Sequence, residues 1–213
     1  IAAEYGVKFL VEPLTQDNYI ANLGRYLGAG DFLVNASFDV SSLDLIEWCQ
    51  QNGVFYIDAC IEPWPGGHTD VSVPVARRSN YAYREAALGL RKKYKSGPAC
   101  VLMHGANPGL VSHLVKQALL NIASDLGMKN AVPQDRKAWA NLARTLQIKV
   151  IHIAERDHQV SPKRKQNDEF VNTWSSEAFC GESMQPAELG WGTHERHWPP
   201  DAREYGFGCG AAI

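Results

Sequence analysis

The sequence predicts an α/β fold with a doubly wound parallel sheet, followed by part of a second, mixed α+β domain. Short apolar segments alternate with helical stretches through the first half of the chain, and this alternation loosens after the long helical stretch that begins near residue 107. Such short strands with helices between them are typical of parallel sheets, which bind ligands at the carboxyl ends of their strands. We place the first domain at residues 1–105 and the second at residues 106–213.

The two ends of the chain indicate a piece of a longer protein. The first residues are typical of the tail of a helix that ends at Gly6, and the apolar run at residues 7–11 predicts a short strand. The chain lacks an N-terminal methionine and stops where another strand is expected to form. No G-x-G-x-x-G sequence follows a predicted strand, so the strongest signature of dinucleotide binding is missing from these residues.

Three apolar segments predict the strands of the sheet, at residues 32–35, 54–59 and 99–104. Helices are expected between and before them, near residues 16–27, 42–52 and 79–96. Ser41 or Ser42 is expected to begin the second helix, which Gly53 ends, and Ser79 begins the third, with Gly97 behind it. Polar motifs follow all three strands, so three loops that are distant in sequence are expected to converge on one crevice.

The stretch at residues 104–127 predicts a strand end that runs into a long helix. Asn107 is expected at the N-cap and Pro108 at the first helical position, with apolar residues at helical spacing behind them. The unpaired N–H groups of a helix N-terminus beside a side-chain amide suit a bound ligand, although the same pattern also serves simply to begin a helix. Further along, residues 133–146 predict an amphipathic helix, and residues 148–154 and 169–174 predict strands.

The composition excludes several classes of protein. With 213 residues, 45% hydrophobic and 21% charged, the chain is long enough to bury a substantial core. Its net charge of −2 argues against general affinity for nucleic acid, and no run of about 18 apolar residues predicts a membrane span. Five widely spaced cysteines suit a reducing compartment better than a disulfide scaffold, so we expect a cytoplasmic protein.

Several unusual strings occur in a fixed order along the whole chain. They are VNASFDVSSLDL (34–45), YIDACIEPW (56–64), RRSNYAYRE (77–85), GANPGLVSHLVKQAL (105–119), HIAERD (152–157), FVNTWSSEAF (170–179) and LGWGTHERHWP (189–199). Together they closely resemble the bacterial homospermidine synthase family, whose members have a saccharopine-dehydrogenase-like fold. The resemblance implies an incomplete Rossmann-like domain, NAD as cofactor and a homodimer, with the glycine-rich loop and the C-terminal region of the family missing from this chain.

The same resemblance implies a polyamine-forming reaction. In the family, NAD⁺ oxidises the amine-bearing carbon of one putrescine to an imine, which loses ammonia and transfers its aminobutyl group to a second putrescine. The hydride then returns, giving homospermidine. One alternative is a saccharopine or carboxynorspermidine-type NAD(P) dehydrogenase, whose substrate carboxylate would need a cation such as Arg156 or Arg196. The other is a non-catalytic ligand-binding domain. As a fragment, residues 1–213 alone are expected to be inactive.

A diamine has an ammonium at each end, so a selective pocket needs carboxylates and aromatic faces. By resemblance, Glu62, Glu155 and Glu182 match the acidic residues of the family that bind the substrate. Trp174 matches the tryptophan that faces the bound amine, and Asn107 matches the active-site asparagine. Without the resemblance, each glutamate would be read as a solvated surface group and the tryptophan as a core residue.

The cofactor pocket is expected to be formed mostly by backbone atoms in loops after strands. By similarity to the family, the expected cofactor-binding residues are Asn35, Ala36, Ser37, Asp58, Ala59, Asn107 and Pro108. Asp39 is equally well explained by a structural turn before the second helix.

No metal site is expected. His194 and His197 lie three residues apart with Glu195 between them, but glycine and a proline pair flank the segment and the zincin pattern H-E-x-x-H is not present. Cys60 and Cys180 lie beside motif residues, yet a catalytic thiol needs a base that the sequence does not identify.

Overall fold

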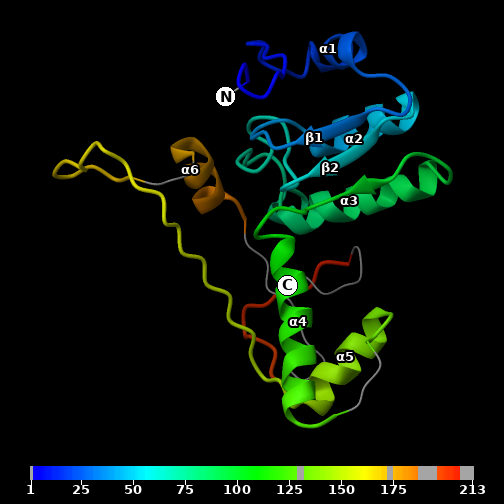
Figure 1. The fold of residues 1–213 in the computed structure, drawn as a ribbon, viewed down its shortest axis with the longest axis vertical. Coiled ribbons are helices and arrows are strands. Elements are labelled where there is room, and N and C mark those ends of the chain that lie inside the picture. The colour runs from blue at the N-terminus through cyan, green and yellow to red at the C-terminus, as the bar shows by residue number, and fades with distance from the viewer. Residues whose placement is uncertain (1, 129–131, 172–174, 187–195, 207–213) are drawn as a thin grey trace.

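The computed structural model describes residues 2–128, 132–171, 175–186 and 196–206. The first half of the chain contains a parallel sheet of three strands in the order β1-β2-β3. The strands are β1 (Phe32–Asn35), β2 (Phe55–Asp58) and β3 (Cys100–Val101). The helices are α1 (Tyr19–Tyr26), α2 (Ser42–Asn52), α3 (Asn80–Lys93), α4 (Leu110–Asp125), α5 (Arg136–Thr145) and α6 (Ser176–Met184), with a short 3₁₀ turn at Val75–Arg77. Figure 1 shows the sheet with α2 and α3 beside it, and α4 and α5 extending away from it. The predicted α/β fold is confirmed.

The two faces of the sheet differ in how they are covered. Side chains alternate along a strand, so Leu33, its partner Tyr56 and the next residue across, Cys100, share one face. That face packs into the core formed with α2 and α3, where Tyr56 is fully buried. The opposite face carries Phe32 and Phe55, which stack on each other and remain 55% and 37% exposed. Among the described residues, the main core therefore lies on the α2 and α3 side.

Both expected ends of α2 and the expected start of α3 are confirmed, whereas α3 ends at Lys93 and not near the expected residue 96. The side chain of Ser41 accepts a hydrogen bond from the backbone N–H of Asp44 (3.3 Å), and α2 ends at Gly53, whose φ of 72° is left-handed. The side chain of Ser79 accepts from the N–H of Ala82 (3.3 Å) at the start of α3. These caps satisfy N–H groups that have no partner within the helix.

Replacing Ser41 by alanine is expected to lower the free energy of unfolding by about 1 kcal/mol, because the N–H of Asp44 loses its acceptor. Chemical denaturation of the purified protein measures the change. Ser96→Ala, at an exposed position outside the helices, is the matched control and is expected to change stability little. Equal stability of the two variants would contradict a capping role for Ser41.

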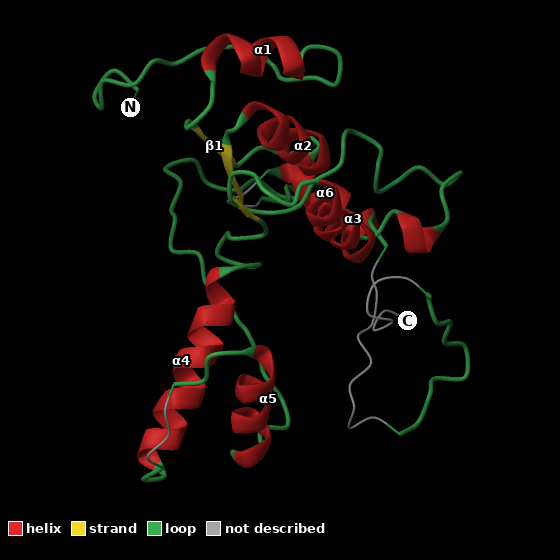
Figure 2. Ribbon diagram, turned by 90° about the vertical axis from the view of Figure 1, so that its right-hand side faces the viewer, coloured by secondary structure: helices red, strands yellow, loops and turns green. Residues whose placement is uncertain are grey.

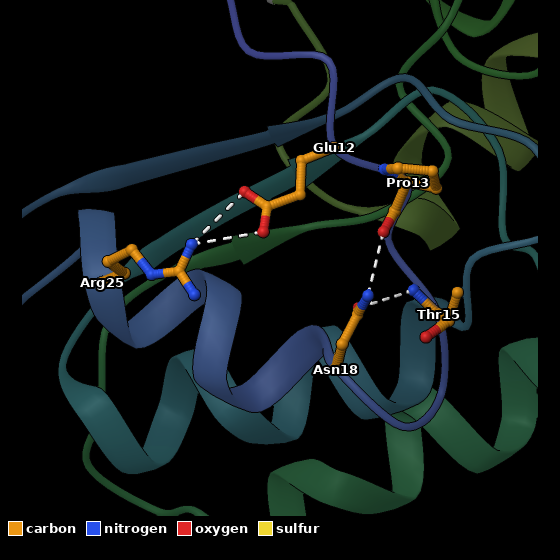
Figure 3. A network of polar contacts seen from close by, with 5 residues as sticks. All are labelled: Glu12, Pro13, Thr15, Asn18 and Arg25. Carbon is orange, nitrogen blue, oxygen red and sulfur yellow. Dashed lines mark hydrogen bonds and ion pairs between the residues drawn. The ribbon is translucent and has the colours of Figure 1, made fainter.

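The segment before α1 is held by side-chain contacts (Figure 3). Asn18 accepts a hydrogen bond from the N–H of Thr15 (2.8 Å) and donates one to the carbonyl of Pro13 (3.0 Å), while Arg25 forms an exposed ion pair with Glu12 (3.2 Å). Residues 2–6 form a hydrogen-bonded turn and not the helix tail expected there, and Gly6 closes this turn with a positive φ of 64°. The strand expected at residues 7–11 is wrong, because the segment is exposed and pairs with no described strand.

The second half is less regular than the first. Helices α4 and α5 pack as a hairpin around Leu119, Ala123 and Leu142, and Figures 1 and 2 both show them side by side below the sheet. The strand expected at residues 148–154 is wrong. The strand expected at residues 169–174 is also wrong in its described part, residues 169–171. No described strand lies beside either segment to accept ladder hydrogen bonds. Residues 148–171 instead form an extended segment without regular secondary structure (Figure 1). Helix α6 was not predicted from the sequence. No described helix is both long and apolar enough to cross a bilayer.

Candidate active site

A cavity of about 1000 Å³ lies at the carboxyl edge of the sheet. Loops that follow β1, β2 and β3 contribute Asp39, Glu62 and Asn107 to its lining. The extended segment contributes Glu155, and α6 contributes Glu182. The expected convergence of distant loops is therefore present, with α6 as an additional wall.

Carboxylates dominate the charged groups of the cavity. Six of them line it: Asp39, Glu62, Glu155, Asp157, Glu177 and Glu182. No lysine or arginine is found among the lining residues in the described part of the chain, and Arg156 and Arg196 both lie outside the lining. A cavity with this charge favours a cationic ligand and disfavours an anionic one.

Glu62 is a cavity carboxylate whose pKa is strongly raised. The backbone of Glu62 is fixed against the start of α2: its N–H donates to the hydroxyl of Ser42 (3.0 Å), and its carbonyl accepts from the N–H of Ser42 (2.8 Å). Burial is the main cause that raises the pKa of Glu62 to about 7, and the negative charges of Asp39 and Glu182 contribute to the same shift. Its carboxyl group therefore changes charge near neutral pH, as active-site acids and bases often do.

Asn107 lies at the cavity, but its expected place as the helix N-cap is wrong. Helix α4 begins at Leu110, its N-cap is Gly109, and no side chain caps it. The N–H groups of Leu110 and Val111 donate instead to the carbonyls of Gly105 (2.8 Å) and Ala106 (3.1 Å). Residues 105–109 thus form a closed loop before the helix, with Asn107 exposed at its tip and a cis peptide bond between Asn107 and Pro108.

The glycines of this loop are required by close backbone contacts. A Cβ atom on Gly105 would lie 2.8 Å from the carbonyl oxygen of Ala59, in the loop after β2. A Cβ atom on Gly109 would lie 2.4 Å from the carbonyl oxygen of Gly105, and its φ of 130° is rarely adopted by other residues. The two glycines therefore set the distance between the Asn107 loop and the sheet.

Two of the residues expected to bind the cofactor have side chains that are already hydrogen-bonded to other groups of the protein. Asp58 is 1% exposed and accepts from the N–H of Met103 (2.6 Å) and the hydroxyl of Tyr56 (2.9 Å). Burial raises the pKa of Asp58, and these two hydrogen bonds oppose the shift. Asn35 is also buried, and it accepts from the N–H of Ser37 (3.1 Å) and donates to the hydroxyl of Tyr56 (3.1 Å). Asn35 thus links the loop after β1 to Tyr56 in β2, and Asp58 links the end of β2 to the loop after β3.

The remaining expected residues have different surroundings. Ala36, Ser37 and Ala59 are exposed in loops at the carboxyl edge, and Pro108 lines the cavity. Trp174, the residue expected to face the amine, lies outside the described residues, as does His194.

Several lining residues were missed by sequence reasoning. His68 and Asp157 lie in loops, and Asn80 and Glu177 lie at helix starts, where a local pattern does not tell a ligand-facing group from a solvated one. Cys60 also lines the cavity, and burial together with the charge of Glu62 raises its pKa to about 12. Its thiol is therefore protonated near neutral pH and is unsuited to act as a nucleophile.

Comparison with known proteins identifies the class. The saccharopine dehydrogenase NADP binding domain model matches residues 1–101, and the saccharopine dehydrogenase C-terminal domain model matches residues 105–212. The chain belongs to the saccharopine dehydrogenase family. Within it, the sequence is similar over its whole length to homospermidine synthases. It is 49% identical to the enzyme of Blastochloris viridis over 100% of this chain and 45% of the relative. It is 46% identical to that of Mesorhizobium japonicum over 99% of this chain and 44% of the relative.

A solved structure is similar as well. The homospermidine synthase of Legionella pneumophila, in complex with NAD, matches with a TM-score of 0.80 and 47% identity, covering 99% of this chain and 43% of that chain. The chain therefore spans less than half the length of the relatives that it matches.

Proposed function

We propose that the protein containing this chain is an NAD-dependent homospermidine synthase, which transfers an aminobutyl group from one putrescine to another and releases ammonia. The observation that carries the proposal is the cavity at the sheet edge, with six carboxylates and no lysine or arginine among its described lining residues. Putrescine has two ammonium groups and no anionic group, so this charge pattern suits it. Sequence identity of 46–49% to named homospermidine synthases supports the same reaction.

Each expected residue has a role in this proposal. Glu62, Glu155 and Glu182 pair with the ammonium groups of the substrate, and Asn107 orients the reacting end from the tip of its loop. Trp174 is proposed to contact the amine through its ring, as in the family resemblance. Because Glu62 has a pKa of about 7, it is the described carboxyl group best suited to take up a proton from an ammonium during turnover.

NAD is the proposed cofactor, and the residues at the sheet edge fit it. Ala36, Ser37 and Ala59 present exposed backbone in loops after parallel strands, which is where dinucleotides bind in such folds. When bound, NAD supplies the oxidation and later reduction of the amine-bearing carbon. Asn35 and Asp58 are proposed to act indirectly, by holding these loops in place through their internal hydrogen bonds.

The domain division and the assembly are also proposals. We propose a nucleotide-binding domain at residues 1–105 and part of a substrate and dimerisation domain at 106–213, because the two family models match 1–101 and 105–212. A homodimer, a cytoplasmic location and the lack of a nucleic-acid partner are proposed from the family resemblance and the slightly acidic composition.

The reaction is tested on the full-length protein with putrescine and a trace of NAD⁺. Polyamine products are followed by mass spectrometry and NADH by absorbance. Homospermidine and ammonia are expected to accumulate far beyond the NAD⁺ supplied, without net NADH. NADH formed in proportion to product would instead indicate a dehydrogenase of the saccharopine or carboxynorspermidine type, and binding without turnover would indicate a non-catalytic domain.

A further inference from the structure

Two buried polar atoms at the cavity have no hydrogen-bond partner. They are Nε2 of His68 and Oδ1 of Asn80, and in the described part of the chain they are the buried side-chain nitrogen and oxygen atoms left without one. Both residues line the cavity that also contains Glu62. A buried polar atom without a partner costs about 1–3 kcal/mol, so two at one cavity indicate a ligand that supplies the missing bonds.

The hydrogen bonding of His68 fixes which partner its free nitrogen needs. Nδ1 of His68 lies 2.8 Å from the backbone carbonyl oxygen of Arg78. A carbonyl oxygen only accepts, so Nδ1 must donate its proton. In the neutral imidazole Nε2 then has a lone pair and is an acceptor. Oδ1 of Asn80 is an acceptor as well, so both atoms require a donor from the ligand.

The position of His68 is held by contacts from three sides. Its backbone carbonyl accepts a hydrogen bond from the guanidinium of Arg78 (2.6 Å), and its ring meets that of Tyr83 edge to face at 5.1 Å. The hydroxyl of Tyr83 donates to the carbonyl of Gly67 (2.8 Å), directly before His68. A Cβ on Gly67 would lie 2.4 Å from Pro63, so the loop admits no larger residue there without moving. The acceptor is therefore held in place before any ligand binds.

Asn80 lies at the start of α3, close in sequence to the residues that hold His68. It is the first residue of the helix, two residues after Arg78, which binds His68, and three residues before Tyr83, which packs on the His68 ring. Asp39 also lines the cavity and interacts electrostatically with His68, and burial raises the pKa of Asp39. The two acceptors thus lie in an acidic part of the cavity.

We propose that His68 Nε2 and Asn80 Oδ1 form an acceptor pair that binds one terminal ammonium group of the diamine substrate. An ammonium has three N–H donors and no acceptor, so it satisfies both atoms and retains a donor for a neighbouring carboxylate. A carboxylate-bearing substrate end has no donor to offer and would leave both atoms unpaired. The pair therefore selects for an amine at this position, and the inference rests on the proposed function.

The test uses the full-length protein loaded with NAD, with putrescine binding measured by calorimetry and KM by product formation. His68→Phe keeps a ring against Tyr83 but has no acceptor, and Asn80→Leu keeps the approximate shape without the oxygen. Each is expected to weaken putrescine binding about tenfold, in line with the loss of one hydrogen bond to a charged group, while the dissociation constant of NAD is unchanged.

Two controls separate binding from folding. Asn80→Asp retains an oxygen acceptor and is expected to bind putrescine at least as well as the parent. Asn52→Leu makes the same change as Asn80→Leu at the exposed far end of α2 and is expected to have no effect on putrescine binding. If His68→Phe does not fold, the inference is tested by the difference in putrescine affinity between Asn80→Leu and Asn80→Asp.

Two results would overturn the inference while leaving the proposed function intact. In the first, the parent makes homospermidine, and the His68→Phe and Asn80→Leu variants bind putrescine as tightly as the parent does. The other is a loss of NAD affinity in both variants without a loss of putrescine affinity, which would assign the pair to the cofactor. Failure of the parent itself to bind putrescine would overturn the proposed function and this inference with it.

Discussion

Replacing Glu62 by glutamine in the full-length protein is expected to lower kcat/KM for putrescine by about 100- to 1000-fold. Glutamine is nearly isosteric, but it removes the charge that pairs with an ammonium in a partly dry cavity, and truncating one partner of such a pair costs about 2–5 kcal/mol. The backbone bonds of Glu62 to Ser42 do not involve the carboxyl group, so the loop should retain its position. Steady-state kinetics with putrescine measure the effect.

Glu12→Gln is the matched control. It makes the same chemical change in the exposed ion pair with Arg25 (Figure 3), and neither residue lines the cavity. Exposed ion pairs contribute about 0–1 kcal/mol, so activity should be unchanged and stability nearly so. A Glu62→Gln variant as active as Glu12→Gln would show that the substrate does not depend on this carboxylate.

The pH dependence of the parent follows from the same group. Below its pKa of about 7, Glu62 is neutral and cannot pair with an ammonium, so kcat/KM is expected to rise with pH through that value. In Glu62→Gln this acid limb is expected to disappear from the profile. A limb near pH 7 that persists in the variant would assign the titration to a different group.

Glu62 should also affect stability in the opposite direction to activity. Its pKa is raised from 4.5 to about 7 in the folded protein, so its proton stabilises the native state below pH 4.5, and this stabilisation is lost as pH rises through about 7. At pH 8 the ionised carboxylate is buried beside other negative charges. The difference in Tm between Glu62→Gln and the parent is therefore expected to shift in favour of the variant when the pH is raised from 5 to 8, as measured by thermal unfolding. Added putrescine should raise the Tm of the parent more than that of the variant.

Local signals in the sequence were sufficient for the first half of the fold. Apolar runs between cap residues placed β1 and α2, because Ser41 and Gly53 have conformational preferences that act within a few residues. The order of strands and loops then brought Glu62 and Asn107 to one edge of the sheet. A parallel sheet allows this inference because all of its strands end at the same edge.

The predictions that were wrong, or missing, concern structures that depend on residues distant in the sequence. Residues 148–154 alternate like a strand, but a strand forms only where a neighbour accepts its hydrogen bonds, and no described strand lies beside them. Asn107 has a good N-cap side chain, yet carbonyls of residues 105 and 106 take the first helical N–H groups. His68 became a candidate only through Arg78 and Tyr83, which lie ten and fifteen residues away in the sequence.

Gly109→Ala is expected to be the most damaging small substitution in the site. The added Cβ would lie 2.4 Å from the carbonyl oxygen of Gly105 and 2.7 Å from Cα of His104, both of them backbone atoms that cannot rotate away. A φ of 130° is also strained for alanine, at a cost of about 1–3 kcal/mol. The contact between Gly105 and Gly109 should open and displace Asn107. Because a misplacement of about 1 Å in a catalytic group can cost about 100-fold in rate, turnover should fall at least that far.

The control for this change is Gly89→Ala, within α3. Apart from the neighbouring backbone of the helix itself, no atom lies within 4 Å of a Cβ at this position. Alanine therefore removes backbone freedom from the unfolded chain and should raise stability by about 0.5–1 kcal/mol without affecting turnover. Denaturation and putrescine turnover, measured on both variants, test the pair of predictions together. If Gly109→Ala retained parental turnover, the position of Asn107 would not depend on the closed loop, and its proposed role in orienting the substrate would have to be abandoned.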